Sequence, residues 1–253
     1  MDSTMRTRLL RVHDLAGRAL FFLGAWACAL HASAQVRCEA RNDAALAPLH
    51  HRVWVTTQAG GDLLRYDTPG RSCELQLDGH ISAWAVSAPG QPTVIAAATV
   101  APAALVFLDT NLRELQRLQL KDRTGQQRSP ICTLLVSQQR QSFVAIFSDM
   151  AELWELSYNP LAAEIGLGMV HDFQYREGHF VAGYLNPLRT ALPWNVAGAG
   201  LDAEGHMVQL RKRASAQGGD TLVIHLDVRK PVRETVQLQG PLQACEIPDL
   251  LQK

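Results

Sequence analysis

Three features of the sequence predict an all-β protein, specifically a partial or small β-propeller of about four blade-like repeats. Stretches such as Leu75–Leu77 alternate apolar and polar residues, which is the period of a half-buried strand. The short apolar runs 93–98 and 142–147 suit buried inner strands. Pro69-Gly70 is a turn signal between strands, and few stretches have helical periodicity.

One unit recurs along the chain, in which a β-rich run reaches an aspartate, turns, and leaves as an alternating strand. The units lie at 63–77, 105–120 and 222–238, with a weaker one at 153–160. Asp67 and Asp109 are 42 residues apart, and blade repeats run about 40–50 residues. The spacing from Tyr158 to Asp227 is too long for one blade, which predicts an insertion between them. A β-sandwich is the alternative architecture.

The N-terminal segment 1–34 predicts a secretory signal peptide. Four arginines precede the apolar run 19–30, and Ala32-Ser33-Ala34 forms a small-residue cleavage site. The run is shorter than the roughly 20 residues of a membrane span, and an uncleaved anchor is the alternative. We therefore expect a domain at 35–253, exported to the periplasm and not attached to the membrane after cleavage.

Charge and motifs exclude several function classes. The chain has 24 basic and 24 acidic residues, so it lacks the basic excess of a nucleic-acid-binding domain. Gly-x-Ser-x-Gly, His-Glu-x-x-His and Walker-type patterns are absent from the sequence, as is zinc-ligand spacing. No hydrolase is indicated.

Four cysteines follow the predicted leader, and an even number permits two disulfides in an oxidising compartment. They are Cys38, Cys73, Cys132 and Cys245. Three connectivities are possible. A Cys38–Cys245 pair would close the domain end to end, and four free thiols are the alternative.

The stretch Ser142–Pro160 resembles a segment of cytochrome d1-type β-propellers, and so do Gly168–Phe173, Arg176–Gly178 and Gly183–Thr190. The resemblance implies a periplasmic propeller that holds haem d1 at its axial face. It also implies a histidine ligand to the iron and basic side chains that pair with the macrocycle carboxylates. Eight blades of the family would need about 360 residues, and 219 residues follow position 34. No Cys-x-x-Cys-His motif is present for a c-type haem.

The resemblance supplies five candidate cofactor-binding residues. His80 and His171 are the candidate iron ligands. Arg176, His179 and Arg189 form a partly basic cluster that could hold a carboxylate. Each assignment has an alternative. His80 would then be a loop residue, His171 would have a structural role, and the cluster would lie in a solvated loop.

These observations favour a binding function over catalysis. After Thr190 the family continues to a distal histidine, but here the next histidine is His206. We expect a protein that binds haem d1 or a related tetrapyrrole, or docks on a larger d1-type propeller. The alternative is an enzyme of haem d1 maturation or nitrite reduction, completed by a homodimer of half propellers. A protein that keeps the fold without a ligand is a third possibility.

Overall fold

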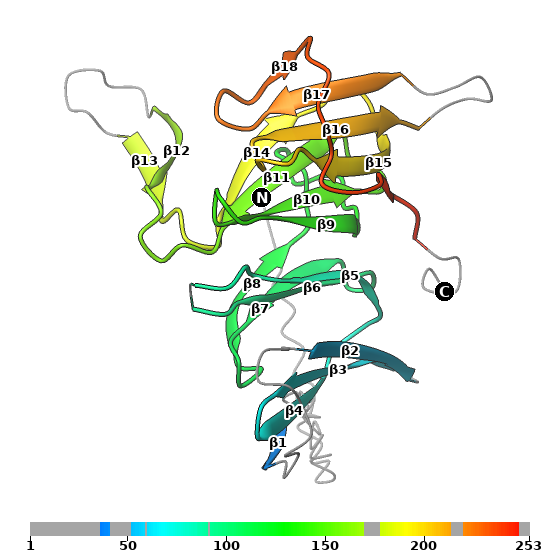
Figure 1. Ribbon diagram of the computed structural model, residues 1–253, viewed down its shortest axis with the longest axis vertical. Coiled ribbons are helices and arrows are strands. Elements are labelled where there is room, and N and C mark those ends of the chain that lie inside the picture. Colours follow the sequence, from blue (N-terminus) through cyan, green and yellow to red (C-terminus); the bar gives the residue numbers. More distant parts are fainter. Residues whose placement is uncertain are drawn as a thin grey trace, which may run out of the picture. The chain divides into compact units, whose positions relative to one another are not determined.

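The computed structural model describes residues 36–40, 52–58, 60–90, 92–169, 178–213 and 220–247. All regular secondary structure in these ranges is β (Figure 1). The chain divides into the units Met1–Ser33 and Ala34–Lys253, and the fold below belongs to the second. The predicted signal peptide lies outside the described residues.

Four antiparallel sheets follow one another along the chain, and we call them blades 1 to 4 (Figure 1). Blade 1 contains β1 (Arg37–Ala40), β2 (Arg52–Gln58), β3 (Gly61–Thr68) and β4 (Arg71–Gln76), in the order β1-β4-β3-β2. Blade 2 contains β5 (Ile81–Val86), β6 (Ile95–Thr99), β7 (Ala104–Leu108) and β8 (Glu114–Gln119) in sequence order.

Blade 3 contains β9 (Ile131–Ser137), β10 (Ser142–Phe147), β11 (Glu152–Ser157) and β14 (Pro187–Ala191). Between its last two strands the chain forms the hairpin β12 (Ile165–Met169) and β13 (Gly178–Val181). Blade 4 contains β15 (Val196–Leu201), β16 (Met207–Lys212), β17 (Thr221–His225) and β18 (Lys230–Val232), with β19 (Gln243–Ala244) paired to β15. The prediction of about four blade-like repeats is confirmed, and the predicted insertion is this hairpin.

The recurring aspartate explains the turn after the third strand of a blade. In blade 2 the Asp109 carboxylate accepts hydrogen bonds from the backbone N–H groups of Asn111 (2.7 Å) and Arg113 (2.9 Å). Asp227 follows β17 at the equivalent place in blade 4. A short polar side chain that satisfies backbone donors fixes a tight turn between adjacent strands, which is why the unit is visible in the sequence.

Three hydrophobic cores lie between successive blades. Leu64 and Tyr66 of blade 1 are buried against Val106 and Leu108 of blade 2. The core between blades 2 and 3 contains five aromatic side chains, those of Phe107, Phe143, Phe147, Trp154 and Tyr158. Val144 and Leu153 of blade 3 pack with Val208 and Ile224 of blade 4. In the described part of the chain no core joins blade 1 to blade 4.

The two terminal faces of this series are partly polar. On the face of blade 1 opposite its core, Trp54, Arg65 and Glu74 form one cross-strand row, and Arg65 lies 3.8 Å from Glu74. On the corresponding face of blade 4, Gln209 pairs with Val223 and Arg211 with Thr221. Both outer faces therefore combine polar side chains with apolar ones, Trp54 on blade 1 and Val223 on blade 4.

Two disulfides are present, as the cysteine count predicts. Cys38–Cys73 joins residues that face each other across β1 and β4, and Cys132–Cys245 joins β9 to the segment after β19. The suggested Cys38–Cys245 pair is wrong. Cys38 lies on the exposed outer strand of blade 1, whereas Cys245 is fully buried in the core between blades 3 and 4.

Candidate functional site

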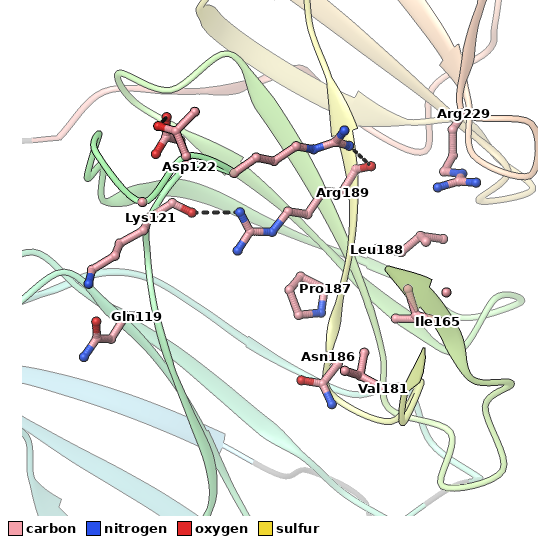
Figure 2. Close-up of a pocket in the computed structure, with 14 residues that line it drawn as sticks. Gln119, Lys121, Asp122, Ile165, Val181, Asn186, Pro187, Leu188, Arg189 and Arg229 are labelled. Atoms are coloured by element: carbon pink, nitrogen blue, oxygen red, sulfur yellow. Dashed lines mark hydrogen bonds between the residues drawn. The ribbon is translucent and has the colours of Figure 1, made fainter. Parts of the chain in front are cut away.

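A pocket of 880 Å³ lies beside two edge strands, β8 of blade 2 and β14 of blade 3, at the base of the β12–β13 hairpin. We call it the outer pocket (Figure 2). Its volume falls within the about 300–1,000 Å³ of small-molecule sites. Its lining combines four cations, one carboxylate and several apolar side chains.

Arg189 is the most constrained of these cations. It lies in β14 opposite Trp154 of β11, and its guanidinium carbon is 4.2 Å from the centroid of the Trp154 ring. Its Nη1 donates a hydrogen bond to the Lys121 carbonyl (3.0 Å) and lies 3.7 Å from Glu152 Oε2. Burial lowers the pKa of Arg189, and the Glu152 carboxylate opposes that shift. The stacked, fixed fork suits a planar carboxylate.

The loop between β8 and β9 places Lys121 and Arg123 at the pocket. Asp122 folds this loop, because its carboxylate accepts hydrogen bonds from Thr124 Oγ1 (2.7 Å) and from the Gln126 and Gln127 N–H groups. These hydrogen bonds lower the pKa of the Asp122 carboxyl, and the bond from Thr124 has the largest effect. The one carboxylate among the lining residues is therefore used within its own loop.

Arg123 covers the open edge of β14. Its Nη2 donates a hydrogen bond to the Arg189 carbonyl (2.7 Å), as the dashed line in Figure 2 marks. Pro187 begins the same strand and has no N–H to offer. A proline and an arginine on an edge strand protect it from pairing with another chain, so β14 can remain the outer strand of blade 3.

Apolar side chains and a fourth cation complete the lining. Ile165 and Val181 come from the hairpin, Leu188 comes from β14, and Arg229 comes from the turn between β17 and β18. In the described ranges neither the Lys121 ammonium nor the Arg229 guanidinium has an acidic partner within an ion-pair distance. The arrangement can bind an apolar molecule that carries carboxylates.

The structure brings part of the predicted cluster to this pocket. Arg189 lines it, and His179 lies in β13, the strand whose Val181 also lines it. His171 and Arg176 lie outside the described residues. Sequence reasoning did not propose Lys121, Arg123 or Arg229 as binding residues. These three residues are basic and stand where strands end, near the strands that flank the insertion. That pattern is the sequence signal that could have identified them.

His80 lies elsewhere, where blade 1 meets blade 2, and does not line the outer pocket. Its Nδ1 is 2.9 Å from Asp62 Oδ1, and Asp62 Oδ2 accepts the Ile81 N–H (2.8 Å). The Asp62 side chain is only 2% exposed. His80 therefore satisfies a buried carboxylate, and a buried carboxylate is costly without hydrogen-bond donors.

We expect His80→Ala to lower the free energy of unfolding by about 1–3 kcal/mol, because Asp62 would lose one of its two donors. His80→Asn should recover part of that loss, since an amide N–H can replace the imidazole donor. Urea denaturation followed by tryptophan fluorescence measures both variants. If His80→Ala had the same urea midpoint as the wild type, the hydrogen bond from His80 to Asp62 would not contribute to the stability of the fold.

A second hollow of 430 Å³ lies along the first strands of blades 2 to 4. Trp84 of β5, Leu134 and Val136 of β9, and Leu201 of β15 form its apolar walls, and Gln239 and Gln243 add amides. It has no charged lining residue, so it lacks groups that would hold carboxylates.

Within the described ranges, no three His, Cys, Asp or Glu side chains are grouped to hold a metal ion. The same ranges contain no helix with the length and apolar composition needed to cross a membrane.

Comparison with known proteins supports the fold. No protein-family model and no curated protein matches the sequence. Among solved structures, the chain is similar to a dihydro-haem d1 dehydrogenase, NirN, in complex with DHE, at a TM-score of 0.52 and 21% sequence identity. The match covers 72% of this chain and 34% of that one, so this chain spans about a third of its length. The similarity shows a d1-like propeller fold.

Proposed function

We propose that the protein binds a carboxylate-bearing tetrapyrrole, haem d1 or a relative, in the outer pocket, without catalysis of its own. The observation that carries the proposal is the lining of this pocket, in which Lys121, Arg123, Arg189 and Arg229 surround apolar side chains. The similar structure is a dihydro-haem d1 dehydrogenase in complex with DHE, which supports the choice of ligand class.

The residues of the pocket fit such a ligand. Arg189 would pair with a ring carboxylate through its guanidinium fork, and Lys121 would add a second cation. Ile165, Val181 and Leu188 would contact the apolar face of the macrocycle. Haem d1 would bring an iron centre, and no histidine is among the residues that line this pocket. His171 stays a proposal as an iron ligand, and His80, which does not line this pocket, would be a ligand only for a haem bound where blade 1 meets blade 2.

Docking on a second copy, or on a larger d1-type propeller, is the other candidate, and one observation favours it. Trp54 of β2 is 52% exposed, and no described strand pairs with the free edge of β2. The polar rows around Arg65 and Glu74 on one terminal face, and around Gln209 on the other, weigh against a ring closed through these faces. An enzyme built by dimerisation would need that closure, and the mass in solution tests it.

We propose that the domain is exported to the periplasm. Both disulfides described above are typical of oxidising compartments and rare in the cytosol. The N-terminal basic and apolar segments agree with export.

An absorption titration of the purified protein with haem d1, and in parallel with haem b, tests the binding function. We expect a saturable spectral shift, weakened about 10- to 100-fold in Arg189→Gln, because a charge-assisted hydrogen bond contributes about 1.5–3 kcal/mol. Arg233→Gln, an exposed arginine outside the pocket, is the matched control and should bind like the wild type. Spectra unchanged by either haem would refute the function.

His80→Ala and His171→Ala belong in the same titration, since loss of the iron-ligand bands in one of them identifies the ligand. Bands that survive in both would remove both histidines as iron ligands while leaving the carboxylate contacts in place.

A further inference from the structure

The cations of the outer pocket lie on two sides of β14. Arg189 points toward the loop of Lys121, while Arg229 lies on the other side of the strand (Figure 2). Successive side chains of a strand point to opposite faces, so Leu188 faces away from Arg189. Figure 2 shows Leu188 between the strand and Arg229. Two positively charged ends are thus separated by apolar side chains.

The backbone at Arg229 supports a binding role. Arg229 has φ 54°, in the left-handed region that favours glycine. Its N–H donates to the His225 carbonyl (2.7 Å), which closes the turn before β18. Non-glycine residues in this region cost free energy and cluster at functional sites, so the backbone agrees with a role for the Arg229 side chain. That side chain lines the pocket and has no acidic partner among the described residues.

We infer that the outer pocket selects tetrapyrroles whose carboxylates lie on opposite edges of the ring. One edge would pair with Arg189 and Lys121, the apolar ring would cross the edge of β14 beside Pro187 and Leu188, and the opposite edge would reach Arg229. A ring with carboxylates on one edge only would pair with Arg189 and Lys121 and would not need Arg229. This inference rests on the proposed function and specifies its ligand.

Metal-free porphyrins test it, because they remove any contribution from iron ligation. The probes are coproporphyrin III, with carboxylates on all four pyrroles, and protoporphyrin IX, with carboxylates on one edge. Quenching of porphyrin and tryptophan fluorescence gives the affinities for the full chain. Arg229→Gly removes the cation and suits the left-handed backbone, so it should fold at least as well as the wild type.

We expect Arg229→Gly to weaken coproporphyrin III about 10- to 100-fold and to leave protoporphyrin IX unchanged. Arg189→Gln should weaken both probes, and the control Arg233→Gln neither. An equal effect of Arg229→Gly on both porphyrins, or none on either, would refute the selection while the binding function stands. Absence of binding by either porphyrin in the wild type would refute the proposed function and the selection with it.

Discussion

A variant without the Cys132–Cys245 disulfide should lose about 4–5 kcal/mol of unfolding free energy, the largest effect that we expect from any single covalent change in this fold. The cysteines are 113 residues apart. In the chain-entropy model, a crosslink across a loop of this length restricts the unfolded chain by about that amount. The double variant Cys132→Ala/Cys245→Ala, unfolded in urea beside the wild type, measures the loss.

The same disulfide ties the C-terminal segment to β9 of blade 3, and the segment also pairs with blade 4 through β19. Only two residues of β19 pair with β15, and the other contacts include the Cys245 N–H to the Ala197 carbonyl (3.0 Å). Gly200 allows Leu238 and Leu242 to approach the strand, because a Cβ at Gly200 would lie 3.3 Å from each side chain. Without the crosslink we expect these few contacts to open first, visible as faster amide exchange at 238–245.

The Cys38–Cys73 pair is the matched control. It closes a loop of 35 residues between strands that are already hydrogen-bonded, so its removal should cost about 1 kcal/mol less in the same model. A loss larger than that of the long-range pair would contradict the entropic explanation.

The sequence predicted the repeat architecture because each blade carries its own local signals. The turn aspartate Asp109 satisfies backbone donors within a few residues, Asp67 binds the nearby Arg65 and Ser72 side chains, and the alternating strands follow from burial on one face. These interactions are local, so they are visible in a linear pattern. The hairpin insertion was visible as an excess of length between Tyr158 and Asp227.

The disulfide connectivity and most of the pocket depend on contacts between distant residues. Cys38 pairs with Cys73 because the N-terminal strand β1 adds to the outer edge of β4, and no local pattern indicates that order. Lys121, Arg189 and Arg229 come from three separate parts of the chain and meet only through the arrangement of blades 2 to 4. Of these three residues only Arg189 was predicted, because it lies in the segment Gly183–Thr190 that resembles cytochrome d1-type propellers.

Arg140 pairs with Glu155 within blade 3 and with Asp227 of blade 4, and this network gives the second large effect. Arg140→Met should lower the unfolding free energy by about 3–5 kcal/mol. Arg140 Nε and Nη2 donate to the Glu155 carboxylate at 2.7 and 3.1 Å, and Nη1 donates to Asp227. The Glu155 side chain is only 9% exposed. In the variant it would keep the Ser142 hydroxyl as a donor, and a buried charge without its counter-ion is strongly destabilising.

The destabilisation caused by Arg140→Met depends on pH through the Asp227 carboxyl. Hydrogen bonding to Arg140 lowers the pKa of Asp227, and the nearby imidazoles of His206 and His225 add to that shift. A carboxylate whose pKa is lower in the folded state stabilises the fold above its unfolded pKa of about 3.9. That contribution is lost as the pH falls through the folded value. The difference between the wild type and Arg140→Met should therefore shrink in urea titrations below about pH 4.

Asp227→Asn separates the two carboxylates that Arg140 joins. Asp227 is half exposed, so its removal should cost less than about 1 kcal/mol at neutral pH, far less than removal of Arg140. In an Asp227→Asn background, the part of the narrowing in acid that Asp227 contributes should disappear. A cost for Asp227→Asn equal to that of Arg140→Met would show that the exposed pair between blades 3 and 4, rather than the buried Glu155 within blade 3, accounts for the destabilisation.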